Sequence, residues 1–269
     1  MKLGIIGYPL SHTISPAMQT AALEAAGIEA TYRAIETAPA FVRARLNEVR
    51  REFRGVNVTI PHKQAVIPFL DGLSPEASAI GAVNTVVVQD GQLIGHNTDA
   101  PGFVRGLEEA GIEYRGRKAL LLGAGGAARA IAYGLKQAGA QVAISNRTPE
   151  RARELAEAVG VGSVSGSLLE AALKTCDLLI NTTSVGLKDP QTSPLPEGIL
   201  PRHATVVDIV YNPLETKLLR DAQAAGLNTL GGFPMLIWQG ALAFELWTGV
   251  KPDVRVMYAA AQKQLKVEG

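Results

Sequence analysis

The feature that most constrains this sequence is a fully apolar run followed directly by a turn of glycines and alanines. Ala119 to Leu122 read as a strand that is apolar on both faces, and Gly123-Ala124-Gly125-Gly126-Ala127-Ala128 comes next. A strand of this kind is typical of a parallel sheet covered by helices on both sides. The turn fits G-x-G-x-x-A, the pattern with which a strand, a tight turn and a helix bind a dinucleotide.

Small residues have three separate purposes in such a turn. Gly123 allows the tight turn, Gly125 lets the backbone approach a pyrophosphate, and Ala128 lets the helix pack closely on the strand. The N–H groups at the start of the helix, near Gly126 and Ala127, are then available to bind anionic phosphates. Because the turn lies between a buried strand and a helix without a capping side chain, we favour a dinucleotide site over a merely flexible loop.

The residues after the next strand, Gln141 to Ser145, indicate which dinucleotide binds. An NAD site places Asp or Glu there to accept from the ribose 2′-hydroxyl, whereas this chain has Asn146-Arg147-Thr148, with Arg151 one helical turn later. A guanidinium can bind a 2′-phosphate through paired hydrogen bonds, and a carboxylate would repel it. The helix dipole disfavours arginine near a helix N-terminus, so an anionic partner explains Arg147 better than a solvated surface role. We therefore predict NADP as the cofactor.

Short β-branched runs alternate with stretches of helical period along the chain, as in α/β proteins. Its 269 residues favour two domains, and the pattern changes near residue 100. The predicted fold class is α/β, with an N-terminal open α/β substrate domain and a Rossmann-type doubly wound NADP domain. Expected strands are residues 2–6, 31–35, 56–58, 83–88, 93–94, 118–122, 141–145, 177–181 and 205–209. Two helices are expected to begin with Ser15 and Ser74 as their N-caps. Further helices are expected at 41–53, 126–139, 148–159, 213–225, 234–248 and 253–265. Asp90-Gly91 is expected to form a hairpin turn.

Composition excludes several classes of protein. With 26 Lys and Arg against 25 Asp and Glu, the chain has no basic field for nucleic acid. No apolar run reaches the ~18–20 residues of a membrane span. The first apolar run, Leu3 to Leu10, is too short for a secretory signal. The single cysteine, Cys176, forms no disulfide within the chain and reads as a small buried apolar residue. The four histidines lack metal-ligand spacing, so we expect no metal site. The single cysteine, with no membrane span and no secretory signal, predicts a cytoplasmic protein.

Four polar clusters in the first hundred residues follow or interrupt apolar strands. They are Ser11 to Pro16, Asn57 to Lys63, Gly81 to Thr85 and Gly95 to Asp99. Open α/β sheets bind ligands at strand ends. Hydroxyl and amide groups with one lysine and one aspartate would suit a small polyhydroxylated substrate.

These clusters belong to a resemblance that runs nearly end to end. Through GYPLSHTISP, NVTIPHK, GAVNT, GHNTD, GAGGAARA, NRTPER, INTTSVG, DIVYNP and GGFPMLIWQGALAFELW, the chain resembles the shikimate dehydrogenase family. The resemblance implies reversible NADPH-dependent reduction of 3-dehydroshikimate to shikimate. It also implies a discontinuous substrate domain, which we place at residues 1–100 plus 236–269, around an NADP domain at 101–235.

The same resemblance implies roles for individual residues. Lys63 and Asp99 are expected to form the catalytic pair. As an ammonium, Lys63 could stabilise the alkoxide that hydride transfer leaves and then protonate it. Asp99 could orient that ammonium or accept from a substrate hydroxyl, and it could also cap a helix that starts near Ala100. Expected substrate contacts are Thr13, where many members have Ser, and Ser15, Thr59, Asn84, Tyr211 and Gln239. Ile209 and Gly232 are expected to border the nicotinamide, and His12, His62 and His96 to support the site through hydrogen bonds.

Three other interpretations stay open at this stage. The nearest is a broader enzyme of the same family that also oxidises quinate and accepts NAD. A non-catalytic module that senses NADPH could share the fold, although it would not need both Lys63 and Asp99. A folate-linked dehydrogenase is more distant. The apolar set around Trp238 and Trp247 packs between domains or between subunits, which leaves a homodimer open.

The proposed phosphate contact of Arg147 can be tested by its removal. Hydrogen bonds to charged groups contribute about 1.5–3 kcal/mol, so Arg147→Ala should weaken NADPH binding about ten- to hundredfold. Titration of NADPH fluorescence with the variant measures this, and an unchanged dissociation constant would contradict the assignment.

Overall fold

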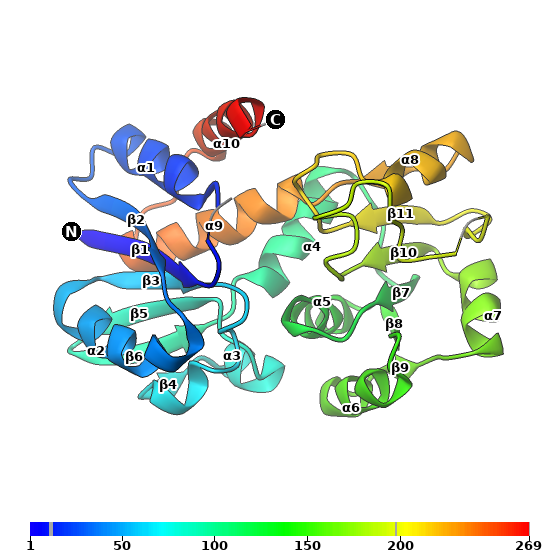
Figure 1. Ribbon diagram of the computed structural model, residues 1–269, viewed down its shortest axis with the longest axis horizontal. Helices are drawn as coiled ribbons and strands as arrows, with labels where there is room; N and C mark the ends of the chain where they lie inside the picture. The colour runs from blue at the N-terminus through cyan, green and yellow to red at the C-terminus, as the bar shows by residue number, and fades with distance from the viewer. Residues whose placement is uncertain (11–12, 197, 269) are drawn as a thin grey trace. The chain divides into compact units, whose positions relative to one another are not determined.

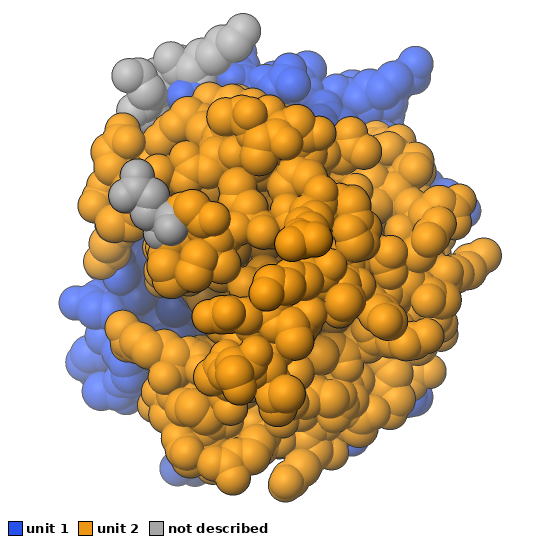
Figure 2. Space-filling view, turned by 90° about the vertical axis from the view of Figure 1, so that its right-hand side faces the viewer, with its two compact units in different colours: residues 1–98, 237–269 blue, residues 99–236 orange. Residues whose placement is uncertain are grey.

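The computed structural model describes residues 1–10, 13–196 and 198–268 and divides them into two compact units (Figures 1 and 2). Unit 1 comprises Met1–Thr98 and Ile237–Gly269, and unit 2 comprises Asp99–Leu236. The boundaries expected from the sequence, 1–100 plus 236–269 and 101–235, differ from these by one or two residues. Unit 1 is thus built from two distant stretches of chain, whereas unit 2 is continuous.

Unit 1 contains a mixed six-stranded sheet in the order β2-β1-β3-β5-β6-β4. Its strands are β1 (Lys2–Gly7), β2 (Thr31–Glu36), β3 (Gly55–Val58), β4 (Gly72–Leu73), β5 (Thr85–Gln89) and β6 (Gln92–His96). β1 pairs in parallel with β2 and β3, but β3 with β5 and β5 with β6 are antiparallel. The hairpin between β5 and β6 turns at Asp90-Gly91, as predicted, and both residues have the positive φ that a type I′ turn requires, 50° and 75°.

The helices of unit 1 confirm one predicted cap and contradict the other. They are α1 (Ser15–Ala25), α2 (Val42–Glu52), which follows a 3₁₀ turn at Pro39–Phe41, α3 (Pro75–Ile80), most of α9 (Phe233–Thr248), and α10 (Val254–Glu268). The Ser74 hydroxyl accepts a hydrogen bond from the Ala77 N–H at 3.1 Å, as an N-cap should. Ser15 was predicted to be the N-cap of α1, and this was wrong. The helix begins at Ser15 itself, with Ile14 as its uncapped N-cap residue, and the buried Ser15 hydroxyl bonds to Tyr32 instead.

The C-terminal helices complete the core of unit 1. Trp247 of α9 is buried, and its Nε1 donates a hydrogen bond to the Val86 carbonyl of β5 at 3.0 Å. Gly55 of β3 makes room for this ring, because a Cβ there would lie 2.3 Å from Trp247 Nε1. The Gln19 side chain of α1 donates to the Gly240 carbonyl of α9 at 2.9 Å. Elements α1, β3 and β5 therefore depend on α9, which lies about 150 residues or more further along the chain, for part of their packing.

Unit 2 is a Rossmann-type doubly wound domain, which confirms the predicted fold class. All six strands are parallel, in the order β12-β11-β10-β7-β8-β9, the 3-2-1-4-5-6 order of dinucleotide-binding folds. They are β7 (Lys118–Leu122), β8 (Gln141–Ser145), β9 (Gly162–Ser163), β10 (Leu178–Asn181), β11 (Thr205–Asp208) and β12 (Thr229–Leu230). Strands β8 and β9 lie on one side of β7, and β10, β11 and β12 lie on the other. Sheets of this kind bind ligands at the carboxyl ends of the strands where the order switches, here β7 and β10.

Helices cover both faces of this sheet (Figure 1). They are α4 (Asp99–Glu109), α5 (Gly126–Gln137), α6 (Pro149–Val159), α7 (Ser167–Thr175) and α8 (Lys217–Ala224). Leu121 of β7 packs with α4, α5 and α6, whereas its neighbour Leu120 packs with α7 and α8. Among the described helices of the chain, none combines the length and apolar character of a membrane span.

Three details of unit 2 differ from the sequence-based expectation. Helix α7 and the two-residue edge strands β9 and β12 were not predicted. The helix expected from residue 213 begins only at Lys217, because Thr216 is its N-cap and accepts from the Leu219 N–H at 3.4 Å. Asp99 is the first residue of α4 rather than the residue that precedes it.

Candidate functional site

The glycine turn after β7 has the backbone that its predicted role demands. Gly123 has φ +117°, a conformation that side-chain-bearing residues rarely adopt. A Cβ on Gly123 would lie 2.6 Å from Thr182 Oγ1, at the end of the adjacent strand β10. The turn is therefore restricted to glycine both by its own conformation and by the neighbouring loop.

The start of α5 offers an anion site built from backbone. Its N-cap residue is Gly125, and no side chain caps the helix. A Cβ on Gly125 would meet no atom within 4 Å, so the space above this backbone is open within the described structure. Gly126 and Ala127 open the helix behind Ala124 and Gly125, while Ala128 is fully buried in the core of unit 2. This arrangement fits a dinucleotide pyrophosphate.

The end of β8 presents unpaired positive charge. Arg147, Thr148 and Arg151 are exposed, and neither arginine has a carboxylate partner in the described part of the chain. Asn146 shapes the segment by donating from Nδ2 to the Thr148 carbonyl at 3.0 Å. Thr148 is the N-cap residue of α6, but its hydroxyl does not cap the helix. Two guanidinium groups without partners beside an uncapped helix start fit a 2′-phosphate.

The two residues expected to border the nicotinamide lie against each other. A Cβ on Gly232 would lie 2.1 Å from the Ile209 carbonyl oxygen, so the two backbones touch at a position that only glycine permits. The Gly232 N–H also donates to the Val210 carbonyl at 3.2 Å. Tyr211 follows in the same loop and is half-buried. These residues follow β11 and β12, at the carboxyl edge that also carries the glycine turn.

A buried acid lies at the carboxyl end of β11, next to these residues. Asp208 is fully buried, and its Oδ1 accepts from Asn181 Nδ2 at 2.9 Å and from the Val210 N–H at 3.0 Å. Its Oδ2 accepts from the Thr216 hydroxyl at 2.7 Å. Burial raises the pKa of Asp208 to about 6, although the three hydrogen bonds act in the opposite direction.

In unit 1, several expected substrate residues belong to one buried hydrogen-bond network. The Tyr32 hydroxyl bonds to Ser15 and donates to Asn57 Oδ1 at 2.7 Å. Asn57 Nδ2 donates in turn to the Asn84 carbonyl at 3.2 Å. Asn84 is buried, and its side chain accepts from the Thr98 N–H at 2.7 Å and donates to Thr98 Oγ1 at 2.9 Å. The network thus holds Ser15 and Asn84 in place and positions the segment that leads to Asp99.

The turn after β3 carries Thr59 and Lys63, which are both half-buried. The Thr59 N–H donates to the Ile6 carbonyl at 2.9 Å, and the Lys63 carbonyl accepts from the Val83 N–H at 2.7 Å. Between them, the buried ring of His62 bonds through Nε2 to the Thr37 carbonyl at 2.6 Å. This bond fixes the turn, a supporting role of the kind expected for this histidine.

Other expected site residues fall in separate parts of the chain. Thr13 is half-buried just before α1, and Gln239 is half-buried on the part of α9 that belongs to unit 1. Ser11 and His12 lie outside the described residues. Lys63 belongs to unit 1, whereas the buried Asp99 opens unit 2, so their pairing stays a prediction.

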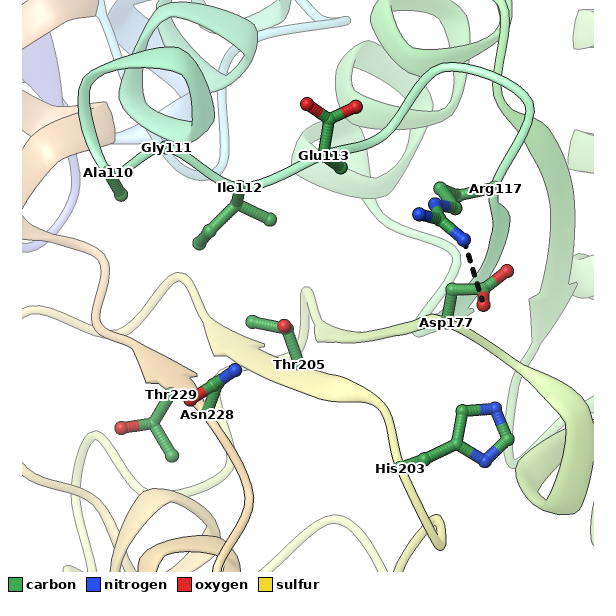
Figure 3. Close-up of a pocket in the computed structure, with 10 residues that line it drawn as sticks. All are labelled: Ala110, Gly111, Ile112, Glu113, Arg117, Asp177, His203, Thr205, Asn228 and Thr229. Carbon is green, nitrogen blue, oxygen red and sulfur yellow. Dashed lines mark ion pairs between the residues drawn. The ribbon is translucent and has the colours of Figure 1, made fainter.

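The cavity in Figure 3 belongs to unit 2 and lies away from the residues at the carboxyl edge of its sheet. It measures about 620 Å³ and is found at the amino ends of the strands of unit 2, where Asp177 precedes β10 and Thr205 begins β11. No predicted site residue lines it. Arg117 approaches Asp177 there to within 4.0 Å. Cys176 is buried nearby, and burial raises the pKa of its thiol to about 11, consistent with the predicted apolar role.

Sequence reasoning missed Asn181 and Asp208, whose side chains hydrogen-bond within the loops after β10 and β11. Both lie in segments that carry the family resemblance, INTTSVG and DIVYNP, but neither was given a role. A signal was present, since each polar residue directly ends an apolar strand of a parallel sheet. The register Asn181 to Asp208 between β10 and β11 brings the two together.

Three family models match the chain and together span both units. The model described as "Shikimate dehydrogenase substrate binding domain" matches residues 5–86. "Shikimate / quinate 5-dehydrogenase" matches residues 107–209, and "Shikimate 5'-dehydrogenase C-terminal domain" matches residues 232–262.

Similar proteins and solved structures cover nearly the whole chain. "Shikimate dehydrogenase (NADP(+))" of Thermus thermophilus is 51% identical over 267 residues, which is 99% of this chain and 100% of the relative. The crystal structure of shikimate 5-dehydrogenase from Thermus thermophilus in complex with NADP(H) and shikimate is 50% identical, with a TM-score of 0.93. The match covers 98% of this chain and 99% of that chain. Quinate dehydrogenase from Corynebacterium glutamicum in complex with NAD is 35% identical, with a TM-score of 0.90. The match covers 98% of this chain and 99% of that chain.

The raised pKa of Asp208 predicts a specific pH dependence of stability. Its carboxyl has a pKa of about 6 in the folded chain against an ordinary value of 3.8, so the folded state holds this proton more tightly between about pH 4 and pH 6. Its contribution to the free energy of unfolding therefore falls as pH rises through that window and stays constant above it. Asp208→Asn cannot ionise, so its stability relative to the unsubstituted protein should improve by about 3 kcal/mol from pH 4 to pH 7. Denaturant unfolding of both proteins at several pH values measures this, and a difference independent of pH would contradict it.

Proposed function

The chain belongs to the shikimate dehydrogenase family, and on this premise we propose that it catalyses the reversible NADPH-dependent reduction of 3-dehydroshikimate to shikimate. The observation that carries the proposal is the near-full-length similarity to a shikimate dehydrogenase whose crystal structure holds both NADP(H) and shikimate. The predicted cofactor-binding residues of unit 2 agree with it, because they follow the carboxyl ends of its parallel strands.

In the proposed complex, unit 2 holds the cofactor. The backbone N–H groups that follow Gly125 bind the pyrophosphate, and Arg147 with Arg151 binds the 2′-phosphate. The contact between Ile209 and Gly232 forms a surface for the nicotinamide. When bound, NADPH supplies the hydride for the ring ketone.

Unit 1 supplies the proposed proton donor. Reduction of the ketone leaves an alkoxide, and Lys63, as an ammonium, stabilises this charge and donates the proton at Nζ. In the oxidation direction the neutral amine accepts that proton. Asp99 orients the ammonium or accepts from a substrate hydroxyl. Substrate hydroxyls and carboxylate are bound by a further set of side chains: Thr13, Ser15, Thr59, Asn84, Tyr211 and Gln239.

A second candidate is a broader enzyme that also oxidises quinate with NAD. It is favoured by the similarity to a quinate dehydrogenase in complex with NAD. The exposed Arg147 after β8, in place of the acid that binds a ribose 2′-hydroxyl, favours NADP over NAD. We also propose a cytoplasmic location and a homodimer. Size-exclusion chromatography with light scattering would test the homodimer.

A two-by-two assay tests the proposed function directly. Purified protein is mixed with shikimate or quinate and with NADP or NAD, and cofactor reduction is followed by absorbance. Shikimate with NADP should give the highest kcat/KM of the four. Equal or higher efficiency with quinate and NAD would favour the second candidate, and no reduction in any pair, with NADPH still bound, would indicate a non-catalytic module.

The role of Lys63 predicts a loss of turnover. General acid–base catalysis contributes about 10²–10⁴-fold, so Lys63→Ala should lower kcat at least about a hundredfold with little change in the KM for shikimate. Lys174→Ala serves as the control, because Lys174 is exposed in the last turn of α7. Near-normal kcat in Lys63→Ala would refute the assignment.

A further inference from the structure

The carboxylate of Asp208 lies behind the predicted cofactor site without belonging to it. We propose that Asp208 is a positioning residue, which fixes the loops after β10 and β11 and, through them, the glycine turn that binds NADP(H). This inference rests on the proposed function for the identity of the ligand.

Asp208 joins three segments that the sequence separates. Its two oxygens accept from Asn181 at the end of β10, from the Val210 N–H in the loop after β11, and from Thr216 at the start of α8. An ionised carboxylate only accepts hydrogen bonds. It therefore dictates that the Asn181 amide turns its Nδ2 toward β11 and its Oδ1 away from it.

The orientation of the Asn181 amide determines the conformation of the next four residues. With Oδ1 turned away from Asp208, it accepts from the Thr183 N–H at 3.0 Å and from the Thr183 hydroxyl at 2.7 Å. The Val185 N–H donates to Thr183 Oγ1 at 3.1 Å, and the Val185 carbonyl accepts from Asn181 Nδ2 at 3.3 Å. A reversed amide would place Nδ2 against the Thr183 N–H, donor against donor, and Oδ1 against the Asp208 carboxylate and the Val185 carbonyl, acceptor against acceptor.

The turn after β10 in turn holds the glycine turn after β7. The Thr182 hydroxyl donates to the Leu122 carbonyl at 2.7 Å. A Cβ on Gly123 would lie 2.6 Å from Thr182 Oγ1 and 3.0 Å from Thr183 Cγ2, so the two turns are in direct contact. A displacement of Thr182 and Thr183 therefore moves the start of the anion site.

A second branch leads from Asp208 to the expected nicotinamide surface. The Val210 N–H donates to the carboxylate, while the Val210 carbonyl accepts from the Gly232 N–H at 3.2 Å. Thr216 also contacts the loop after β10, because a Cβ on Gly186 in that loop would lie 3.2 Å from Thr216 Cγ2. The loops after β10 and β11 are thus fixed by one carboxylate.

The surroundings of Asp208 argue against a purely stabilising role. Its hydrogen-bond partners in the described structure are neutral, and none of the described ion pairs includes it. A buried carboxylate without a cation lowers folding stability. Proteins keep such arrangements mainly where function requires them.

Binding of NADPH by three variants tests the proposal without relying on turnover. Asp208→Ala leaves three buried donors without an acceptor and should weaken NADPH binding at least tenfold in a fluorescence titration. Asp208→Asn keeps a carbonyl oxygen for Val210 and Asn181 and can donate to Thr216 Oγ1, so it should restore the dissociation constant to within about threefold. Asp177→Asn is the matched control at the opposite end of β10, and it should leave binding unchanged.

The outcomes separate a positioning role from a structural one. A structural role would lower the melting temperature and the fraction of active protein, while the folded Asp208→Ala fraction would bind NADPH within twofold of the unsubstituted protein. That result would overturn the proposal. If Asp208→Ala does not fold, Thr216→Val decides, because it keeps the side-chain shape and removes the hydroxyl that donates to Asp208 and caps α8. It should weaken NADPH binding at least threefold, and unchanged binding would overturn the proposal.

The proposed function is tested independently in the same preparations. Unsubstituted protein that binds NADPH but does not oxidise shikimate would contradict the proposed function and leave the comparison of dissociation constants valid. If the unsubstituted protein oxidises shikimate and Asp208→Ala has an unchanged dissociation constant and KM for NADP, the positioning role fails on its own.

Discussion

Close contact between backbones at the carboxyl edge of one parallel sheet is the constraint on which the cofactor site depends. Gly123 touches the loop after β10, and Gly232 touches Ile209 after β11. Protein interiors are packed too densely to absorb an added methyl group at such a contact. The distance between the neighbouring loops is therefore set by the lack of a side chain at Gly123 and at Gly232. This distance in turn positions the polar groups that the loops carry.

The electrostatics of unit 2 are divided between its surface and its interior. Positive charge for a phosphate lies on exposed arginines after β8, where water lowers the cost of keeping them unpaired. The negative charge of Asp208 lies inside, where three neutral donors hold it. Hydrogen bonds are directional and act at short range, so the buried carboxylate of Asp208 is suited to fixing geometry. The exposed arginines are suited to attracting an anionic ligand.

Much of this arrangement could be predicted from local sequence. The run Ala119 to Leu122, the hairpin at Asp90-Gly91 and the NADP-type residues around Arg147 each depend on neighbours in the chain. Prediction failed where a distant partner decides the outcome. Ser15 opens α1 instead of capping it, and its hydroxyl interacts with Tyr32 of β2. Thr216, which caps α8 and delays its start to Lys217, also bonds to Asp208 of another segment. Pairing between Lys63 and Asp99 also depends on tertiary placement, which sequence spacing does not determine, and it stays a prediction.

The discontinuity of unit 1 has a consequence for synthesis on the ribosome. Unit 2 contains its whole core in one uninterrupted stretch, but β3 and β5 of unit 1 pack on the indole of Trp247, 161 residues beyond its partner Val86. At about 5–20 residues per second, roughly 10–30 s pass between their emergence. The segment that is made first is therefore completed last, and its apolar strand surfaces need protection from aggregation while the nascent chain grows.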